Sequence, residues 1–261
     1  MRAVGCCLAP QARCASAQAD TRSEIGFRLG AYDARYPLTI DPNYVWHTFY
    51  GSSGYDVGYG IAVDGSSNVY ITGISNAAWQ GDGGTNPLHA HSGGYDIVAL
   101  KLNSAGAYQW HTFYGSSDND YGRGIAVDAS GNVYITGYSP ATWQGDGGTN
   151  PLHAYSGGYD IVALKLTSAG AFRWHTFYGS SSSDYGYGIA VDASGNVYIT
   201  GFSDATWQGD GGTNPLHAHS GSEDIFALKL GSVPTAVTLS SFRAEPSPLN
   251  LWQWLLQFLG R

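Results

Sequence analysis

Three copies of one polar loop carry the side chains of this sequence that are best suited to binding chemistry. The string WQGDGGTNPLHA begins at Trp79, Trp143 and Trp207, so each copy offers an indole, a carboxylate and an amide at the same spacing. The candidate ligand-binding residues are Trp79, Asp82, Asn86, Trp143, Asp146, Asn150, Trp207, Asp210 and Asn214. Aromatic faces beside Asp and Asn suit carbohydrate, because the ring stacks on the sugar while the polar groups bind its hydroxyls. A lectin-like site is therefore one interpretation.

Each of these residue types also has a structural interpretation. For the three tryptophans the structural role is favoured, in which they plug gaps between packed units and fold the long loop onto a sheet. Asp82, Asp146 and Asp210 could supply oxygen ligands for calcium, but Asp residues flanked by glycine are more often turn residues that bond their own backbone. We therefore expect no cofactor, with these three aspartates as weak calcium candidates.

The remaining acids and histidines do not predict catalysis. Asp64, Asp128 and Asp192 end one strand of each copy and are expected to cap a hairpin. His47, His111 and His175 lie between aromatic residues inside a predicted strand, where packing is expected. The chain has no serine in a nucleophile elbow and no phosphate loop with lysine. Because an enzyme usually builds one asymmetric catalytic centre, acids repeated three times favour a non-enzyme over a hydrolase or lyase.

These loops sit in a repeat with a period of 64 residues. WHTFYGSS begins at Trp46, Trp110 and Trp174, and a fixed period of this size marks an array of equivalent units. In the second copy, Val, Ile, Tyr, Phe and Thr dominate four segments that end in turn residues. These segments are GIAVD (124–128), NVYITGY (132–138), DIVALKL (160–166) and AFRWHTFY (171–178). Four antiparallel strands per unit predict the all-β fold of a β-propeller, with one 64-residue unit per blade.

The repeat resembles a known family. The order of motifs is similar to that of the SBBP repeat: YG-S-S, then D-YG-GIAVD-SGN-VYITG, then DI-ALKL-SAG. The GIAVD–SGNVY part resembles the NHL propeller repeat more weakly. YPLTIDP (36–42) is similar to the junction that joins SBBP arrays to an upstream domain. The resemblance implies a seven-bladed propeller in a bacterial protein that is secreted or displayed on the cell surface. It implies no catalytic residues.

The number of copies departs from a closed ring. Three blades are fewer than the four to eight of a typical propeller, and an open arc leaves edge strands exposed. One extra fourth-type strand, Val45–Tyr50, is predicted before the first set, whereas the third set lacks its fourth strand after Leu230. We therefore expect a two-chain, six-bladed ring or a fragment of a longer gene product.

Strand direction places the long connections together. Because the strands of a blade alternate in direction, the second-to-third and fourth-to-first connections emerge on the same face. The first of these contains WQGDGGTNPLHA, and the other is YGSSGYDVGYG (50–60) in the first copy. Long loops without secondary structure are often functional, so this face is the predicted binding surface.

Charge and composition exclude several partners. The chain carries a formal net charge of −8, and residues 46–230 hold fifteen acidic and five basic residues, so nucleic acid is not an expected partner. All three cysteines lie at Cys6, Cys7 and Cys14, so no disulfide framework supports the repeats.

The ends of the chain differ in composition from the array. Residues 1–24 are expected to be a leader or truncated start, residues 25–44 a junction, residues 45–230 the propeller array, and residues 231–261 a linker with a short apolar tail. That tail, LNLWQWLLQFLG, is shorter than the about 20 residues of a membrane span. The sequence thus predicts an extracellular or cell-surface interaction or scaffold module.

Overall fold

The computed structural model describes residues 44–231, which form three antiparallel sheets and no α-helix. The chain divides into two units, residues 1–48 and 49–261, and each is considered by itself. Every strand of the described residues lies in the second unit. The predicted leader, most of the predicted junction and the predicted C-terminal linker and tail lie outside the described residues.

The sheets correspond to the three sequence repeats, and we call them blades 1, 2 and 3. Blade 1 contains β1 (Asp56–Val63), β2 (Val69–Ser75), β3 (Asp96–Leu102) and β4 (Tyr108–Tyr114). Blade 2 contains β5 (Tyr121–Val127), β6 (Val133–Ser139), β7 (Asp160–Leu166) and β8 (Phe172–Tyr178). Blade 3 contains β9 (Asp184–Val191), β10 (Val197–Ser203) and β11 (Asp224–Leu230). The prediction of an all-β propeller array is confirmed.

Each blade is a meander of neighbouring strands joined by tight turns on one side. In blade 2, the Asp128 carboxylate accepts hydrogen bonds from the backbone N–H groups of Ser130 and Asn132, both at 2.9 Å. These bonds fix the turn between β5 and β6, as expected for an Asp at the end of a strand. The equivalent bonds recur at Asp64 and Asp192, so the predicted hairpin caps are confirmed.

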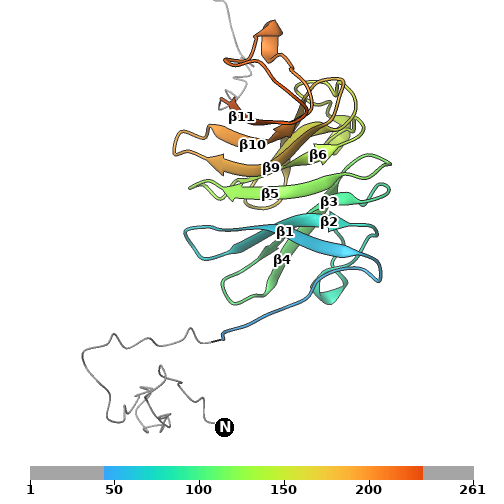
Figure 1. Ribbon diagram of the computed structural model, residues 1–261. Coiled ribbons are helices and arrows are strands. Elements are labelled where there is room, and N and C mark those ends of the chain that lie inside the picture. Colours follow the sequence, from blue (N-terminus) through green and yellow to red (C-terminus); the bar gives the residue numbers. More distant parts are fainter. Residues whose placement is uncertain (1–43, 232–261) are drawn as a thin grey trace, which may run out of the picture. The chain divides into compact units, whose positions relative to one another are not determined.

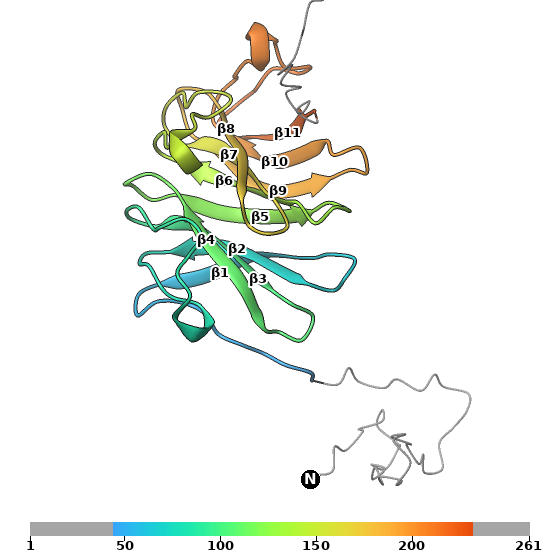
Figure 2. The same ribbon diagram turned by 180° about the vertical axis from the view of Figure 1, so that it is seen from behind.

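The blades follow one another in chain order, with the face of one sheet against the next (Figure 1). The core between blades 1 and 2 includes Ile97 and Val162, each 0 % exposed, and Ile125, 8 % exposed. The view from behind shows the same succession of sheets (Figure 2). The three blades form an open arc.

The predicted strand Val45–Tyr50 is wrong for this structure, because residues 44–50 belong to no sheet. The side chains have strand character, but a strand needs a neighbouring strand for its backbone hydrogen bonds. In blades 1 and 2, the fourth strand pairs with the third strand of its own sheet. Within the described residues, no third strand pairs with residues 44–50.

Candidate functional site

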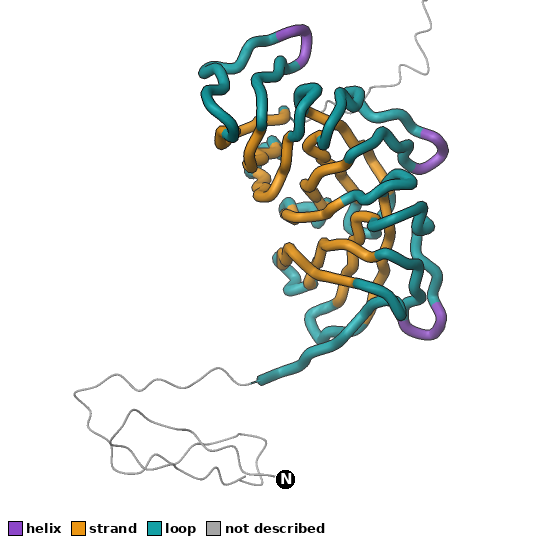
Figure 3. The backbone as a smooth tube through the Cα atoms, turned by 45° about the vertical axis from the view of Figure 1, so that its right-hand side comes forward, coloured by secondary structure: helices purple, strands orange, loops and turns teal. Residues whose placement is uncertain are grey.

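The long loops gather at one end of the blades, as strand direction predicts. In blade 1 the loop between β2 and β3 meets the connection from β4 to β5: the N–H of Gly94 donates to the Ser117 carbonyl at 3.2 Å. The N–H of Asp120 likewise donates to the Tyr95 carbonyl at 2.6 Å. Each long loop carries a 3-10 turn, η1 (Asp82–Gly84), η2 (Asp146–Gly148) or η3 (Asp210–Gly212), at its tip (Figure 3).

Each tip is a preformed turn. In the first copy, the N–H of Gly81 donates to the Thr85 carbonyl at 2.8 Å, and Gly83 and Gly84 have φ of 65° and 76°. Glycine suits these two positions, because positive φ is costly for residues with a Cβ. The Gln80 amide nitrogen then donates to the Asn86 amide oxygen at 2.9 Å across the loop. The other two copies repeat this geometry, so the chain presents one polar shape three times.

Two of the three candidate tryptophans are buried beneath these tips. Trp79 is 8 % exposed and stacks on His111 at 3.7 Å between ring centroids, while Trp143 is 5 % exposed and stacks on His175 at 3.9 Å. Each histidine also donates from Nε2 to the carbonyl of its tryptophan, at 3.0 and 3.1 Å. Trp207 has no histidine partner of this kind in blade 3 and is half-buried. Trp79 and Trp143 therefore fasten their loops to the sheet and have little surface left for stacking on a sugar.

The candidate carboxylates are exposed, and each is tied to the end of the preceding repeat. Tyr50, Tyr114 and Tyr178 donate their hydroxyl hydrogens to Asp82, Asp146 and Asp210, at 3.1, 3.0 and 3.0 Å respectively. Asn86, Asn150 and Asn214 are exposed at the same tips. These six polar side chains, with the neighbouring glutamines, form what we call the loop rim.

For the calcium interpretation, the loop rim offers few carboxylates. Each tip supplies one carboxylate, and within residues 44–231 no three His, Cys, Asp or Glu side chains come together in a metal-binding group. Calcium sites usually combine several oxygen ligands, including more than one carboxylate.

A second group of acids lies beneath the rim and is buried. Asp96 and Asp120 are 0 % exposed, and both approach Gly115: a Cβ on that glycine would lie 2.8 Å from Asp96 Oδ1 and 2.7 Å from Asp120 Oδ2. Asp160 and Asp184 flank Gly179 in the same way. Asp120 accepts hydrogen bonds from the N–H and hydroxyl of Ser116, at 2.6 and 2.9 Å. These pairs fasten the blade connections, and their burial keeps them from a substrate.

Burial raises the pKa of Asp120 to about 7, and the nearby Asp96 adds to this shift. Since an Asp in an unfolded chain titrates near about 3.9, the charged carboxylate destabilises the folded state. The stability contribution of this group is present below about pH 4 and is lost as the pH rises through about 7. The pKa of Asp160 is likewise raised by burial, to about 6.

We expect Asp120→Asn to remove much of the loss of stability between about pH 4 and about pH 7, which lies between the unfolded and folded pKa values of Asp120. An amide resembles the protonated carboxyl, and its oxygen can still accept from Ser116. Thermal melts of both proteins at several pH values measure the effect, and each pKa unit corresponds to about 1.4 kcal/mol. Asp118→Asn is the matched control, because Asp118 is exposed two residues away. Parallel pH curves for the wild type and Asp120→Asn would contradict this account.

One cluster escaped the sequence analysis because it breaks the repeat. The guanidinium of Arg123 lies 4.0 Å from the ring centroid of Tyr59 and donates to the Tyr138 hydroxyl at 2.6 Å. It also lies 5.8 Å from the ring of Tyr187. Residues 59, 123 and 187 are equivalent positions of the three copies. The Arg in the second copy, where the other two copies have Tyr, was the sequence signal that could have revealed this cluster.

Comparison with known proteins identifies the repeat. Residues 45–78, 109–141 and 173–206 each match the family model described as "Beta-propeller repeat", SBBP. The chain carries three SBBP repeats. Each match begins one residue before WHTFY and ends after the second strand of a sheet, so the second and third matches each span parts of two successive blades.

Two curated proteins are similar to this chain. An uncharacterized WD repeat-containing protein of Acanthamoeba polyphaga mimivirus is 26 % identical over 207 residues, which cover 70 % of this chain and 14 % of that protein. The regulatory protein FlaEY of Caulobacter vibrioides is 27 % identical over 182 residues, 69 % of this chain and 19 % of that protein. The chain thus spans less than a fifth of either relative. Within residues 44–231, no helix has the length and apolar character of a membrane span.

Proposed function

We propose that this protein is a non-catalytic interaction module that binds a macromolecular partner through the loop rim. The observation that carries the proposal is the threefold presentation of one exposed, preformed polar tip, held by the Gln80–Asn86 bond and its equivalents. A preorganised surface loses less conformational entropy on binding than a flexible one. We favour a protein partner over a glycan, because His111 and His175 cover the indoles that a lectin would use for stacking.

The comparisons support an interaction role without naming a partner for this chain. One relative carries WD repeats and the other is named a regulatory protein, and both names fit interaction rather than turnover. We propose an exported or cell-surface location from the resemblance to SBBP arrays. The proposal also includes a second copy of this chain as a partner that completes a six-bladed ring.

Site-specific photo-crosslinking tests the binding surface. A photoreactive residue replaces Asn86 on the loop rim, or Ser66 in the β1–β2 turn at the opposite end of blade 1, in the full chain in its own cells. Both positions are exposed, so they form a matched pair. We expect discrete crosslinked protein species from position 86 and none from position 66, and loss of these species in Asn150→Ala/Asn214→Ala chains.

Two other outcomes would contradict the proposal. Equal crosslinking from positions 66 and 86 would mean that the loop rim is not the binding surface. Binding of the purified protein to a glycan array, retained when no protein crosslink forms, would favour the lectin-like alternative.

A further inference from the structure

Blade 3 ends in an open edge at the place where blades 1 and 2 have their fourth strands. β3 pairs with β4 and β7 with β8, whereas β11 pairs only with β10 within the described residues. Ile97 and Ile161 are both 0 % exposed and lie against Gly122 and Gly186 of the following blade, but the equivalent Ile225 on β11 is 88 % exposed. The outer face of blade 3 is therefore uncovered as well, and its unpaired edge is a template for another strand.

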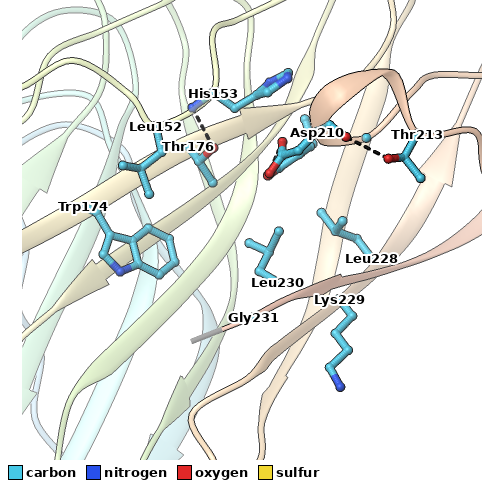
Figure 4. Close-up of a pocket in the computed structure, with 12 residues that line it drawn as sticks. Leu152, His153, Trp174, Thr176, Asp210, Thr213, Leu228, Lys229, Leu230 and Gly231 are labelled. Atoms are coloured by element: carbon cyan, nitrogen blue, oxygen red, sulfur yellow. Dashed lines mark hydrogen bonds between the residues drawn. The ribbon is translucent and has the colours of Figure 1, made fainter. Parts of the chain in front are cut away.

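A groove of about 660 Å³ lies beside this edge. It is bounded by Trp174 and Thr176 of β8, by Gly209 and Asp210 of the third loop tip, and by Leu228 and Leu230 of β11 (Figure 4).

Comparison of the blades shows which side chain is missing from the groove. A Cβ on Gly81 would lie 2.2 Å from Cζ of Tyr108, and a Cβ on Gly145 would lie 2.1 Å from Cζ of Phe172. At the equivalent Gly209, no atom comes nearer than 3.8 Å. In blades 1 and 2, the aromatic ring that begins the fourth strand therefore fills the place that is open in blade 3.

The described chain begins with a segment of the matching sequence. Tyr44–Tyr50 reads YVWHTFY, whereas β4 reads YQWHTFY and β8 reads FRWHTFY. Tyr44 contacts His47 at 5.6 Å between centroids and an interplanar angle of 61°, and Tyr108 contacts His111 at 5.7 Å and 61°. The hydroxyl of Tyr44 is also hydrogen-bonded to His47 Nδ1, as that of Tyr108 is to His111 Nδ1. This part of the segment already has the side-chain arrangement of a fourth strand.

The contacts of Tyr50 place the end of this segment against blade 1. Tyr50 lies 6.1 Å from Trp79 and 5.7 Å from Tyr108, and Tyr114 lies 6.0 Å from Trp143 and 5.7 Å from Phe172. β4 thus pairs within blade 1 while its last residue packs on blade 2. By analogy with β4, Tyr44–Tyr50 would pair within a blade that precedes blade 1. β11, in contrast, belongs to blade 3, at the other end of the array.

Blade 1 lacks cover on the side where a preceding blade would lie. Ile61 and Val63 of β1 are 69 % and 58 % exposed, while Ile125 of β5, equivalent to Ile61, is 8 % exposed beneath blade 1. Within residues 44–231, Tyr44–Tyr50 thus has the sequence of a fourth strand but belongs to no sheet, β11 pairs with no fourth strand, and one face of blade 1 is bare. Because three blades do not close a ring, a second copy would supply both the strand and the cover.

We propose that Tyr44–Tyr50 of one copy adds to β11 of a second copy as its fourth strand, and that the reciprocal exchange closes a six-bladed ring. The Tyr44 ring fills the groove beside Gly209, and His47 stacks on Trp207, as His111 stacks on Trp79. By the register of β3 and β4, Thr48 lies opposite Ala227, as Thr112 lies opposite Ala99. This inference rests on the proposed pairing of two copies and gives it a geometry. Two identical interfaces related by a two-fold axis close the assembly.

Cysteine crosslinking between two differently marked full-length chains tests this geometry. Cys6, Cys7 and Cys14 are first replaced by Ser. One chain then carries Thr48→Cys and the other carries Ala227→Cys, and the mixture is oxidised mildly. Directly opposite residues on paired strands lie within disulfide reach, so we expect most of the mixed pairs to form a crosslinked dimer that contains one chain of each kind. Ala163→Cys is the matched control, because Ala163 already lies opposite Thr176 within blade 2, and it should give none.

The mass of the unmodified protein separates the possible failures. Twice the chain mass together with the Thr48–Ala227 crosslink supports the strand exchange. Twice the chain mass without this crosslink overturns the exchange but leaves the pairing of copies. A single-chain mass overturns both, and so does a Thr48→Cys/Ala227→Cys chain that crosslinks internally. The binding role of the loop rim is tested separately by the crosslinks from position 86.

Discussion

Gly137→Ala is expected to lower the free energy of unfolding by about 3 kcal/mol or more, which is at the severe end for one substitution. A Cβ at Gly137 would lie 1.7 Å from the backbone oxygen of Tyr121 and 2.8 Å from its carbonyl carbon. The obstacle is backbone, so no side chain can rotate away. β5 and β6 would have to separate next to the irregular register between Gly122 and Gly124. Denaturant unfolding followed by circular dichroism measures the loss.

Gly65→Ala is the matched control for this substitution. Gly65 lies in the β1–β2 turn, has no atom within 4 Å of an added Cβ, and has no positive φ. We expect a change within about 0.5 kcal/mol, as for most surface positions. If the two variants lost similar amounts of stability, the close approach of the Tyr121 backbone would not be the reason that position 137 requires glycine.

His175→Ala is expected to destabilise the protein by about 3 kcal/mol, because it empties a buried site and breaks a polar contact. His175 is 0 % exposed, stacks on Trp143 with an interplanar angle of 8° and bonds its carbonyl. Burial lowers the pKa of His175 to about 4, so the ring is neutral at pH 7 and its substitution by alanine removes no charge. Urea unfolding measures the stability. Tryptophan emission should shift to longer wavelength as the second loop loosens.

His217→Ala is the control for this second substitution, because His217 is exposed in the third repeat. It should leave both stability and emission unchanged. If His175→Ala behaved like His217→Ala, the histidine would not fasten the Trp143 loop, and the indole would again be a candidate for stacking on a ligand.

The repeated features of the fold were predictable from the sequence because they depend on local chemistry. DIVALKL at 160–166 coincides with β7, and the Asp128 turn depends on hydrogen bonds within four residues. The gathering of the long loops at one end of the blades was also predictable, from strand direction alone. Val45–Tyr50 failed as a strand because pairing depends on a partner that local sequence does not show.

The candidate site was less predictable, since contacts between distant residues decide it. Trp143 looked available for binding, but His175 covers it from 32 residues away in sequence. The hydroxyl of Tyr114 reaches Asp146 over the same separation. The burial of Asp120 depends on the neighbouring blade connection, so its raised pKa had no sequence signal. Arg123 was detectable only as a departure from an otherwise regular repeat.

Electron microscopy of the purified full-length protein tests the central claim most directly, namely that two open arcs complete one propeller. Viewed along the axis, the particles should be closed rings of six blades with two-fold symmetry. Isolated arcs of three blades, at concentrations where the protein remains folded, would contradict the claim.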